Sequence, residues 1–353
     1  MDDRIIQMLP KVHFPGAVFT GANSLFYLKT LDQAKTLIVA SETAWRLHRA
    51  KIEKHMQSKR IIEAGHEPTV DDMESLKAEV RKGGYESVIG FGGGSAMDLA
   101  KTSRMQDDGI RLVLIPTTSG TGSESSRYAI MINEKKEKEP VTSEKMVPDV
   151  VLLDHSFTLS LPPFETAYTS IDALSHSVEG LVSRLGNPLS DSLAAASIDI
   201  IAENLPKAFR NQLDAQARSA LQVAGFLGGL VQSSASVGLA HSFANCLGPK
   251  LGIPHGAAIA AFLPDVVRFN MEKSEKCAKL RNPAFLRDGD VAGKLSGLLG
   301  QVGLADYLNQ LDFSPVDIDA AAESIKSDVC TKTNPYNPSV DEIRGLLASF
   351  GVR

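Results

Sequence analysis

Short apolar runs alternate with amphipathic stretches through the first part of the chain, and this alternation limits the fold more than any other feature. The runs KTLIVAS, YESVIGFG and RLVLIPT are typical of buried strands, and the stretches between them carry apolar residues at helical spacing. Strands that alternate with helices in this way form a parallel sheet with helices packed on both faces. Residues 1–157 are therefore predicted to form an α/β domain.

From residue 158 the pattern changes to long amphipathic stretches without a convincing strand. Apolar residues recur at helical spacing in DSLAAASIDIIAENLPKAF, GAAIAAFLPDVVRFN and DEIRGLLASFG, and prolines stand where helices would begin or break. We expect an all-helical domain over residues 158–353, so the predicted fold is an α/β N-terminal domain followed by an all-α C-terminal domain.

Composition and charge describe an ordinary globular protein of 353 residues. Hydrophobic residues make up 43% and charged residues 22%, and a net charge of −5 without a basic surplus argues against nucleic acid as a partner. The three cysteines lie far apart without a CxxC spacing, so a disulfide framework is not expected and a reducing cytoplasm is predicted. No apolar run approaches the roughly 18 residues of a membrane span, and the N-terminal sequence is not typical of a secretory signal.

A glycine-rich loop, GFGGGSAMDLAK at residues 90–101, stands between a predicted strand and a predicted helix. Its glycines let the backbone approach an anion, and the helix that follows presents free amides and the positive end of its dipole. The loop matches neither GxGxxG nor the Walker sequence, so a phosphate site competes here with a tight turn that binds nothing.

A second polar loop, IPTTSGTGSESS at residues 115–126, also follows an apolar strand. Its hydroxyl side chains and two glycines suit ribose, pyrophosphate or an adenine edge, although a plain surface loop would have a similar composition. Open α/β sheets bind ligands beyond the carboxyl ends of their strands. Two such loops after two buried strands favour a nucleotide site, which makes residues 1–157 a nucleotide-binding domain.

Four potential metal ligands appear in two pairs within the helical half. Asp172 and His176 have the spacing i, i+4, so a helix would place both on one face. His241 stands inside a predicted helix and His255 just ahead of the next one. Three imidazoles and one carboxylate suit Zn²⁺ or Fe²⁺, whereas an isolated DxxxH on a helix is usually accidental. The other histidines are predicted to be surface residues: His13, His48, His55, His66 and His155.

Four segments together resemble the iron-activated, metal-dependent (group III) alcohol dehydrogenase family: GGGSAMDLAK, PTTSGTGSE, DALSHSVEG and AHSFANCLGPKLGIPHG, in this order and spacing. The resemblance covers nearly the whole chain, including KTNPYNP at residues 332–338. It implies a dehydroquinate synthase-like, iron-containing alcohol dehydrogenase fold, a homodimer, one divalent metal ion (Fe²⁺ or Zn²⁺) and a nicotinamide cofactor (NAD or NADP).

Carried over to this sequence, the resemblance implies that the catalytic metal is bound by Asp172, His176, His241 and His255. It implies that the cofactor is bound by Gly93, Gly94, Ser95, Asp98, Thr117, Thr118, Thr121 and Lys138. A divalent ion holding the substrate oxygen polarises a carbonyl for hydride attack or stabilises an alkoxide, and nicotinamide carries the hydride. The expected enzyme is an NAD(P)-dependent alcohol dehydrogenase or aldehyde reductase acting on a small polar substrate. No step needs a thiol, so Cys246 is predicted to be a core residue.

Two positions depart from the family pattern. Many members carry a second histidine four positions after the ligand that corresponds to His241, and this chain has Asn245 there. The proton relay is therefore open, with water or a substrate group as the candidates. NAD-preferring members often carry Asp where this chain has Ser41. Ser41 removes a charge that would repel a 2′-phosphate, whereas the neighbouring Glu42 could accept from the ribose 2′-hydroxyl of NAD. Ser41 therefore joins the predicted cofactor residues, and the balance favours NADP slightly.

Two other functions compete with the dehydrogenase. An NAD-using metal-dependent lyase of the dehydroquinate synthase type shares the architecture, but it generally places Glu at the metal, where this chain has Asp172. A relic that binds metal or nucleotide without catalysis is disfavoured by the intact set of ligands. The substrate stays open among simple alcohols, diols and small aldehydes with a carboxylate, sulfonate or phosphonate group.

Overall fold

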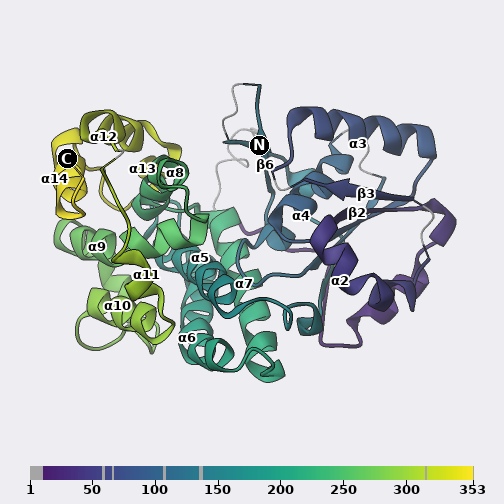
Figure 1. Ribbon diagram of the computed structural model, residues 1–353, viewed down its shortest axis with the longest axis horizontal. Coiled ribbons are helices and arrows are strands. Elements are labelled where there is room, and N and C mark those ends of the chain that lie inside the picture. Colours follow the sequence, from purple (N-terminus) through teal and green to yellow (C-terminus); the bar gives the residue numbers. More distant parts are fainter. Residues whose placement is uncertain are drawn as a thin grey trace, which may run out of the picture. The chain divides into compact units, whose positions relative to one another are not determined.

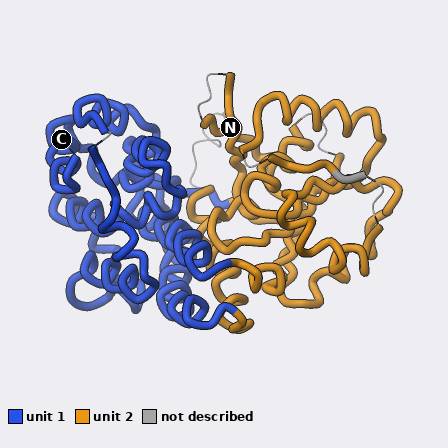
Figure 2. The backbone as a smooth tube through the Cα atoms, in the orientation of Figure 1, with its two compact units in different colours: residues 1–12, 162–212, 234–353 blue, residues 13–161, 213–233 orange. Residues whose placement is uncertain are grey.

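The computed structural model describes residues 11–57, 60–65, 67–105, 109–134, 138–314 and 316–352. The described chain divides into two compact units, coloured separately in Figure 2. One contains His13–Leu161 and Leu213–Ser233, and we call it the α/β unit; the other contains Pro162–Gln212 and the residues from Ser234 on, and we call it the helical unit. The predicted domains, residues 1–157 and 158–353, are a separate division of the chain from these units, and they remain a prediction.

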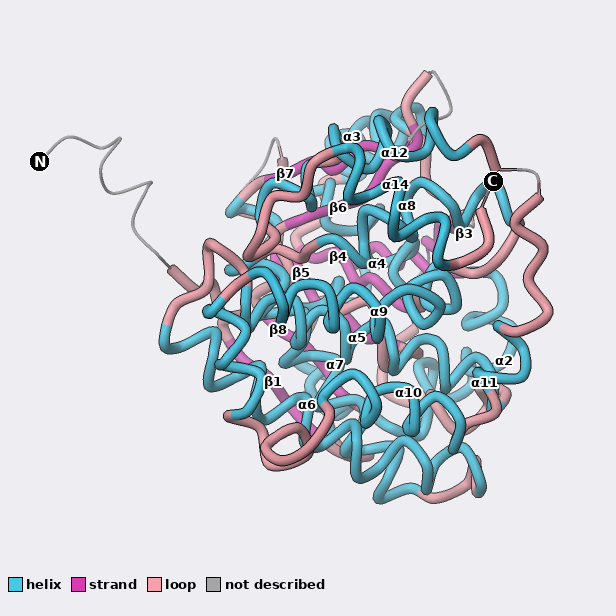
Figure 3. The backbone as a smooth tube through the Cα atoms, turned by 90° about the vertical axis from the view of Figure 1, so that its left-hand side faces the viewer, coloured by secondary structure: helices cyan, strands magenta, loops and turns pink. Residues whose placement is uncertain are grey.

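A six-stranded sheet in the order β1-β8-β5-β4-β2-β3 forms the centre of the α/β unit (Figure 3). All neighbouring strands run parallel, as the alternating sequence predicts. Strands β6 and β7 pair with each other in a separate antiparallel hairpin. The strand bounds are β1 Ala17–Thr20, β2 Thr36–Ser41, β3 Arg60–Ala64, β4 Ser87–Gly92, β5 Arg111–Pro116, β6 Tyr128–Ile132, β7 Lys138–Thr142 and β8 Val150–Leu153.

Apolar side chains on both faces of the sheet are buried. Along β2, Ile38 and Ala40 belong to one hydrophobic cluster, and Leu37 and Val39 belong to another. Because successive side chains of a strand point to opposite faces, the two clusters show that both faces are covered. The helices of this unit are α2 Glu42–Glu53, α3 Val70–Gly83, α4 Gly94–Lys101 and most of α7 Ala215–Ala235, with 3₁₀ turns at Ser24–Thr30, Gln33–Lys35, Thr102–Arg104, Ser123–Ser125, Glu144–Met146 and His155–Phe157.

The described residues of the helical unit contain helices and no strand, which confirms the predicted all-α half (Figure 1). Its long central helix, α5 (Pro163–Val182), packs against α6 and α9 and is buried along most of its length. The other helices are α6 Pro188–Arg210, α8 Leu239–Leu251, α9 His255–Lys273, α10 Val291–Gln301, α11 Leu304–Leu308, α12 Ile318–Ser327, α13 Val329–Thr333 and α14 Val340–Ser349, with a 3₁₀ segment at Glu275–Arg281.

Within the described ranges, no single helix is both long and apolar enough to cross a membrane. Two consecutive helices that meet at a bend, Ala215–Ala235 and Leu239–Leu251, are together long and apolar enough by length and composition alone.

The prediction that His48 is a surface residue is wrong. Its side chain is buried, its Nε2 lies 3.1 Å from the hydroxyl of Ser160, and its ring meets that of Phe157 edge-on. His48 stands four positions from both Ala44 and Ile52, which are buried on the same side of α2. A polar residue inside an apolar helical stripe was therefore the signal for burial. His66 lies outside the described residues.

Helix α7 belongs to the α/β unit because it packs on the loop that follows β5. A Cβ atom built on Gly122 would lie 2.3 Å from Cα of Gly229, so the two backbones touch. The hydroxyl of Ser125 donates to the carbonyl of Phe226 at 2.9 Å, and the side-chain amide of Gln222 donates to the carbonyl of Pro116 at 3.2 Å.

Charged groups are also buried behind this loop. Lys101 is fully buried, and its ammonium group lies 2.9 Å from a carboxylate oxygen of Asp98 and donates to the carbonyls of Ser123 and Tyr128. Burial raises the pKa of the Glu124 carboxyl from 4.5 to about 7, although the charge of Lys101 opposes this shift. The region thus buries one fully paired cation and one carboxyl that keeps its proton below neutral pH.

We expect Glu124 to make the α/β unit less stable as the pH rises from about 4.5 to about 7. The folded chain holds the proton that the unfolded chain loses, so the stabilisation is complete below the unfolded pKa and is lost as the pH rises through the folded one. A rise to about 7 corresponds to about 3 kcal/mol. Urea unfolding across this pH range should show a slope that Glu124→Gln reduces, and an equal slope in both proteins would contradict the assignment.

The contact between Gly122 and α7 can be tested with two glycines of nearly equal φ, 61° at Gly122 and 62° at Gly84. A Cβ on Gly84 meets nothing within 4 Å, so Gly84→Ala should cost only the left-handed conformation, about 1–2 kcal/mol. Gly122→Ala should cost about 1–3 kcal/mol more, because the methyl group strikes the α7 backbone. Thermal unfolding of both variants measures the difference, and equal losses would disprove the packing argument.

Candidate metal centre and cofactor loops

Helix α5 presents Asp172 and His176 on one face, one turn apart. Both side chains are buried, and Nε2 of His176 lies 3.4 Å from Oδ1 of Asp172. Helix α5 packs against α6 and α9, and Asp172 and His176 both lie in its buried segment. The spacing i, i+4 thus places both groups at one point inside the helical unit, as predicted.

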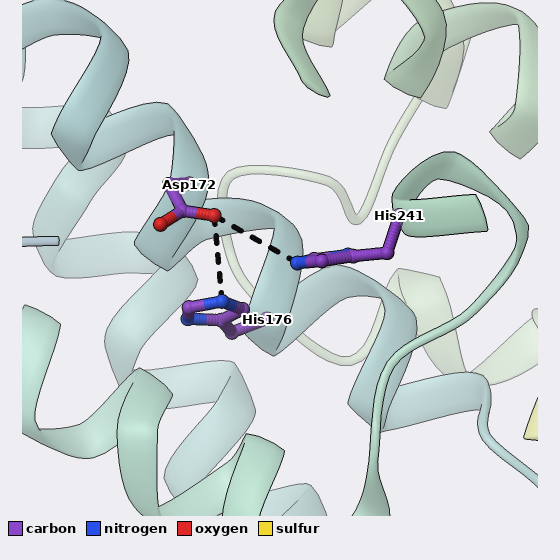
Figure 4. Close-up of side chains that lie close together, drawn as sticks. All are labelled: Asp172, His176 and His241. Carbon is purple, nitrogen blue, oxygen red and sulfur yellow. Dashed lines mark ion pairs between the residues drawn. The ribbon is translucent and has the colours of Figure 1, made fainter. Parts of the chain in front are cut away.

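Two further helices bring the remaining predicted ligands to the same carboxylate oxygen. Nε2 of His241, on α8, lies 3.7 Å from Oδ1 of Asp172, and Nε2 of His255, the first residue of α9, lies 3.8 Å from it. In Figure 4 the side chains of Asp172, His176 and His241 point toward one another. The rings of His176 and His241 are stacked, with centroids 5.1 Å apart. His241 is buried, whereas the side chain of His255 is 41% exposed.

The arrangement fits a bound divalent metal ion. Tetrahedral coordination with bonds of about 2.1 Å would separate neighbouring ligand atoms by about 3.4 Å, and the three nitrogens lie 3.4, 3.7 and 3.8 Å from the Asp172 oxygen. Among the described residues, this oxygen and Nε2 of His241 are buried without a hydrogen-bond partner. Buried polar atoms are normally paired, so an ion that binds both explains them. Asp172, His176 and His241 form a cluster able to hold a metal.

The pKa values of the two buried histidines shift in opposite directions. Burial, with a smaller contribution from His241, lowers the pKa of His176 well below its usual value. Burial also acts to lower the pKa of His241, but the hydrogen bond and charge of Glu179, helped by the charge of Asp172, raise it overall. A metal ligand must be a neutral imidazole, and the environment of His176 favours that form directly.

The two glycine-rich loops lie side by side beyond the carboxyl ends of β4 and β5. The amide of Thr117 donates to the carbonyl of Gly92 at 2.9 Å. A Cβ on Gly94 would lie 3.1 Å from the side chain of Thr121, and a Cβ on Gly93 would lie 3.7 Å from that of Thr118. The first turn of α4, with Gly93 as its N-cap, has no side-chain cap, so its amides and dipole are available to an anion.

Ser41 stands at the end of the neighbouring strand β2 and faces the first loop. Gly92 has φ 148°, a conformation that glycine favours, and a Cβ there would lie 2.9 Å from the hydroxyl of Ser41. The same hydroxyl accepts from the amide of Ala44 and caps α2. The structure thus brings together six predicted cofactor residues: Ser41, Gly93, Gly94, Thr117, Thr118 and Thr121.

The other predicted cofactor residues differ in their surroundings. Ser95 is the second residue of α4 and is half-buried. The carboxylate of Asp98 accepts from the amide of Ile130 at 3.0 Å, bonds the hydroxyl of Ser123 and pairs with Lys101. Lys138 lies on the β6–β7 hairpin, where its side chain is 55% exposed and pairs with Glu67 at 2.8 Å. The contacts of Asp98 are those of a structural residue, and its cofactor role stays a prediction, as does that of Lys138.

The residues flanking His241 also differ from expectation. Asn245 is exposed on α8 and lies 3.4 Å from a carboxylate oxygen of Asp328. Cys246, predicted to be a core residue, is only half-buried. Sequence reasoning missed Glu179, which stands seven positions after Asp172 and three after His176 and binds the ring of His241. Its position on the face of α5 that carries both ligands was the available signal.

Comparison with known protein families matches both parts of the chain. Residues 15–155 match the family model of iron-containing alcohol dehydrogenase, and residues 166–350 match the C-terminal model of the Fe-containing alcohol dehydrogenase family.

Relatives with known names agree with this match. The chain is 33% identical over 306 residues to the probable alcohol dehydrogenase EutG of Escherichia coli, covering 80% of this chain and 77% of that protein. It is 30% identical over 375 residues to the sulfoacetaldehyde reductase of Bilophila wadsworthia, covering 95% and 96%. The crystal structure of sulfoacetaldehyde reductase from Bifidobacterium kashiwanohense in complex with NAD⁺ superimposes with a TM-score of 0.84 at 22% identity, covering 97% and 99%, and shows the shared fold.

The order of the motifs, the convergence of three imidazoles on one carboxylate and the match over both halves lead to one conclusion. The chain belongs to the iron-containing alcohol dehydrogenase family and is a metal-dependent, NAD(P)-linked oxidoreductase of alcohols and aldehydes.

Proposed function

We propose that a single divalent metal ion, Fe²⁺ or Zn²⁺, is held by Asp172, His176, His241 and His255 and serves hydride transfer between a nicotinamide and a small polar alcohol or aldehyde. The observation that carries this proposal is the approach of three Nε2 atoms to one oxygen of Asp172, at 3.4 to 3.8 Å. The family assignment favours the dehydrogenase over the lyase and the inactive relic, since net oxidation of NAD(P)H is a property of the dehydrogenase alone.

A bound divalent ion supplies a Lewis acid that polarises a substrate carbonyl or stabilises an alkoxide. The chain's own residues prepare the place for it. His176 and His241 are buried and keep water from one side, whereas His255, 41% exposed, marks the solvent side of the cluster. The negative charge of Asp172 offsets part of the charge of the ion, and the buried setting strengthens that interaction.

We further propose that the loops after β4 and β5 and the start of α4 bind the cofactor, together with Lys138 on the β6–β7 hairpin. The residues of the loops and of α4 are Gly93, Gly94, Ser95, Asp98, Thr117, Thr118 and Thr121. Amides at the start of α4 face an anion without competition from a side-chain cap, which suits a pyrophosphate. The hydroxyls of Thr118 and Thr121 stand beside the two glycines that open this helix.

The proposed proton path does not include Asn245. A carboxamide neither gains nor loses a proton near neutral pH, and Asn245 contacts Asp328. We propose that the proton of the substrate hydroxyl passes to water or to a group of the substrate itself. Hydride transfer and proton transfer are thus served by different groups.

Ser41 supports NADP as the preferred cofactor. It places a neutral hydroxyl, and no carboxylate, at the end of β2 beside Gly92. Glu42, in the first turn of α2, is exposed and opposes this preference. Three free cysteines agree with a reducing cytoplasm, and we propose that the enzyme works there as a homodimer with domains at residues 1–157 and 158–353. The substrate proposal extends from simple alcohols and diols to small aldehydes with an acidic group, which include the aldehyde named for the Bilophila relative.

His176→Ala should remove the bound metal and abolish turnover, because it deletes a buried ligand. Metal analysis of the purified wild type is expected to find about one ion per chain, and the variant should retain almost none. His13→Ala is a matched control, since His13 pairs with Glu144 and lies in the α/β unit. Activity is measured as NAD(P)H oxidation with a panel of small aldehydes. A wild type that binds no iron or zinc when supplied and oxidises no NAD(P)H would refute the proposed function.

Ser41→Asp should shift preference from NADPH toward NADH. Asp remains a good N-cap, so α2 keeps its start while the new charge repels a 2′-phosphate. We expect the ratio of kcat/KM for NADPH over NADH to fall at least about tenfold, equivalent to about 1.4 kcal/mol. Glu42→Gln should move the ratio in the opposite direction. An unchanged ratio in both variants would show that the residues at the end of β2 do not distinguish NADP from NAD.

A further inference from the structure

Glu179 is a buried carboxylate that touches the metal cluster without belonging to it. It lies on α5, on the same face as Asp172 and His176, and is 3% exposed. An ionised carboxylate in such a place needs hydrogen-bond donors. Its donors come from the first turn of α8, the helix that carries His241, and from the N-cap residue of that helix.

Three donors of one short segment meet this carboxylate. Oε2 accepts from the amide of Gly238 at 3.0 Å and lies 2.5 Å from Nδ1 of His241. Oε1 accepts from the amide of Ala240 at 2.7 Å. A carboxylate only accepts, so Nδ1 of His241 must carry the ring proton. The lone pair of this imidazole is then on Nε2, the atom that faces Asp172 at 3.7 Å.

The same carboxylate closes the N-terminus of α8. The helix begins at Leu239, and its N-cap, Gly238, has no side chain to satisfy the first amides. Glu179 accepts the amides on either side of Leu239, and the side-chain oxygen of Asn334 accepts that of Leu239 at 3.2 Å. A negative charge at this N-terminus also interacts favourably with the positive end of the helix dipole. His241 thus stands in a first turn whose amides are fixed by residues distant in sequence.

Two further features show that the surrounding residues accommodate and orient these acceptors. A Cβ on Gly238 would lie 2.9 Å from Oε1 of Glu179 and 2.9 Å from Oδ1 of Asn334, so both acceptors reach the helix only because position 238 is glycine. Asn334 is itself oriented by a reciprocal pair of amide hydrogen bonds with Asn270, at 2.9 and 2.8 Å. By contrast, Nδ1 of His176 has no hydrogen-bond partner among the described residues.

We propose that Glu179 is a positioning residue that fixes the tautomer and ring orientation of His241, so that Nε2 is ready for the metal before the metal arrives. This inference rests on the proposed role of His241 as a ligand. Carboxylates that hold the second nitrogen of a ligand histidine raise metal affinity by fixing the ring and its tautomer. Here the same group also anchors the helix that carries the histidine.

Glu179→Gln tests this role with little change of shape. The amide offers one acceptor oxygen to three donors, so at least one buried donor faces an NH₂ group. If that donor is His241, its proton moves to Nε2 and blocks the metal-binding atom. We expect Co²⁺ and Zn²⁺, added to metal-free protein in competition with a chelator, to bind about 10–100-fold more weakly than in the wild type. The visible absorption of bound Co²⁺ should change as well.

Asp199→Asn provides a matched control in the same unit. Asp199 also accepts two backbone amides, those of Ala284 at 3.0 Å and Phe285 at 2.7 Å, but it contacts none of the four ligands. It should lose stability and keep its metal dissociation constants. Asn334→Ala removes an acceptor from α8 without touching His241, and its effect on the metal dissociation constant should be smaller than that of Glu179→Gln.

A measurement on the metal-free wild type needs no variant of Glu179 to fold. Nitrogen-15 NMR of labelled histidines is recorded at a pH high enough to leave the His241 ring neutral, with His241 assigned by its loss in His241→Gln. It should show a proton on Nδ1 and none on Nε2. A neutral ring with its proton on Nε2, or equal metal affinity in wild type and Glu179→Gln, would overturn the positioning role and leave the proposed function standing. A wild type that binds neither Co²⁺ nor Zn²⁺ would overturn both.

Discussion

A buried carboxylate oxygen that has no hydrogen-bond donor among the described residues is the constraint on which the helical unit depends. Oδ1 of Asp172 is buried and has no such donor among the described residues, and three imidazole nitrogens surround it. An uncompensated anion in this place would be costly. A cation bound at the same point would remove the cost and would stabilise only the folded chain, which would couple metal binding to the folding of this unit.

Helix α5 carries both the ligands and their support. Asp172, His176 and Glu179 follow the spacing i, i+4, i+7, which keeps all three on one face. The first two face the metal position, and the third holds the start of α8. A shift of this helix would therefore move two ligands directly and a third through its hydrogen bond. Contacts of α5 with α6 and α9 oppose such a shift.

The sequence predicts features that depend on local pattern and on unusual residue types. Alternating apolar runs predicted the parallel sheet, and the spacing of Asp172 and His176 predicted two ligands on one helix face, both of which the structure shows. Features that depend on a distant partner were not predictable. Helical spacing identifies α7 but does not show that Gly229 packs against Gly122, and a single Glu or Asn in a helical sequence does not show that α8 is its partner.

This difference has a physical reason. A metal ligand must be one of a few side chains, so its type limits its role, whereas a residue that supports a ligand needs only an acceptor and can be any of several. The choice of residue is then limited at the position that must leave space for the acceptor. Gly238 is such a position, because a methyl group there would meet both Glu179 and Asn334. In this chain, Gly238, three positions before His241, is therefore the local sequence feature that accompanies a carboxylate from another helix.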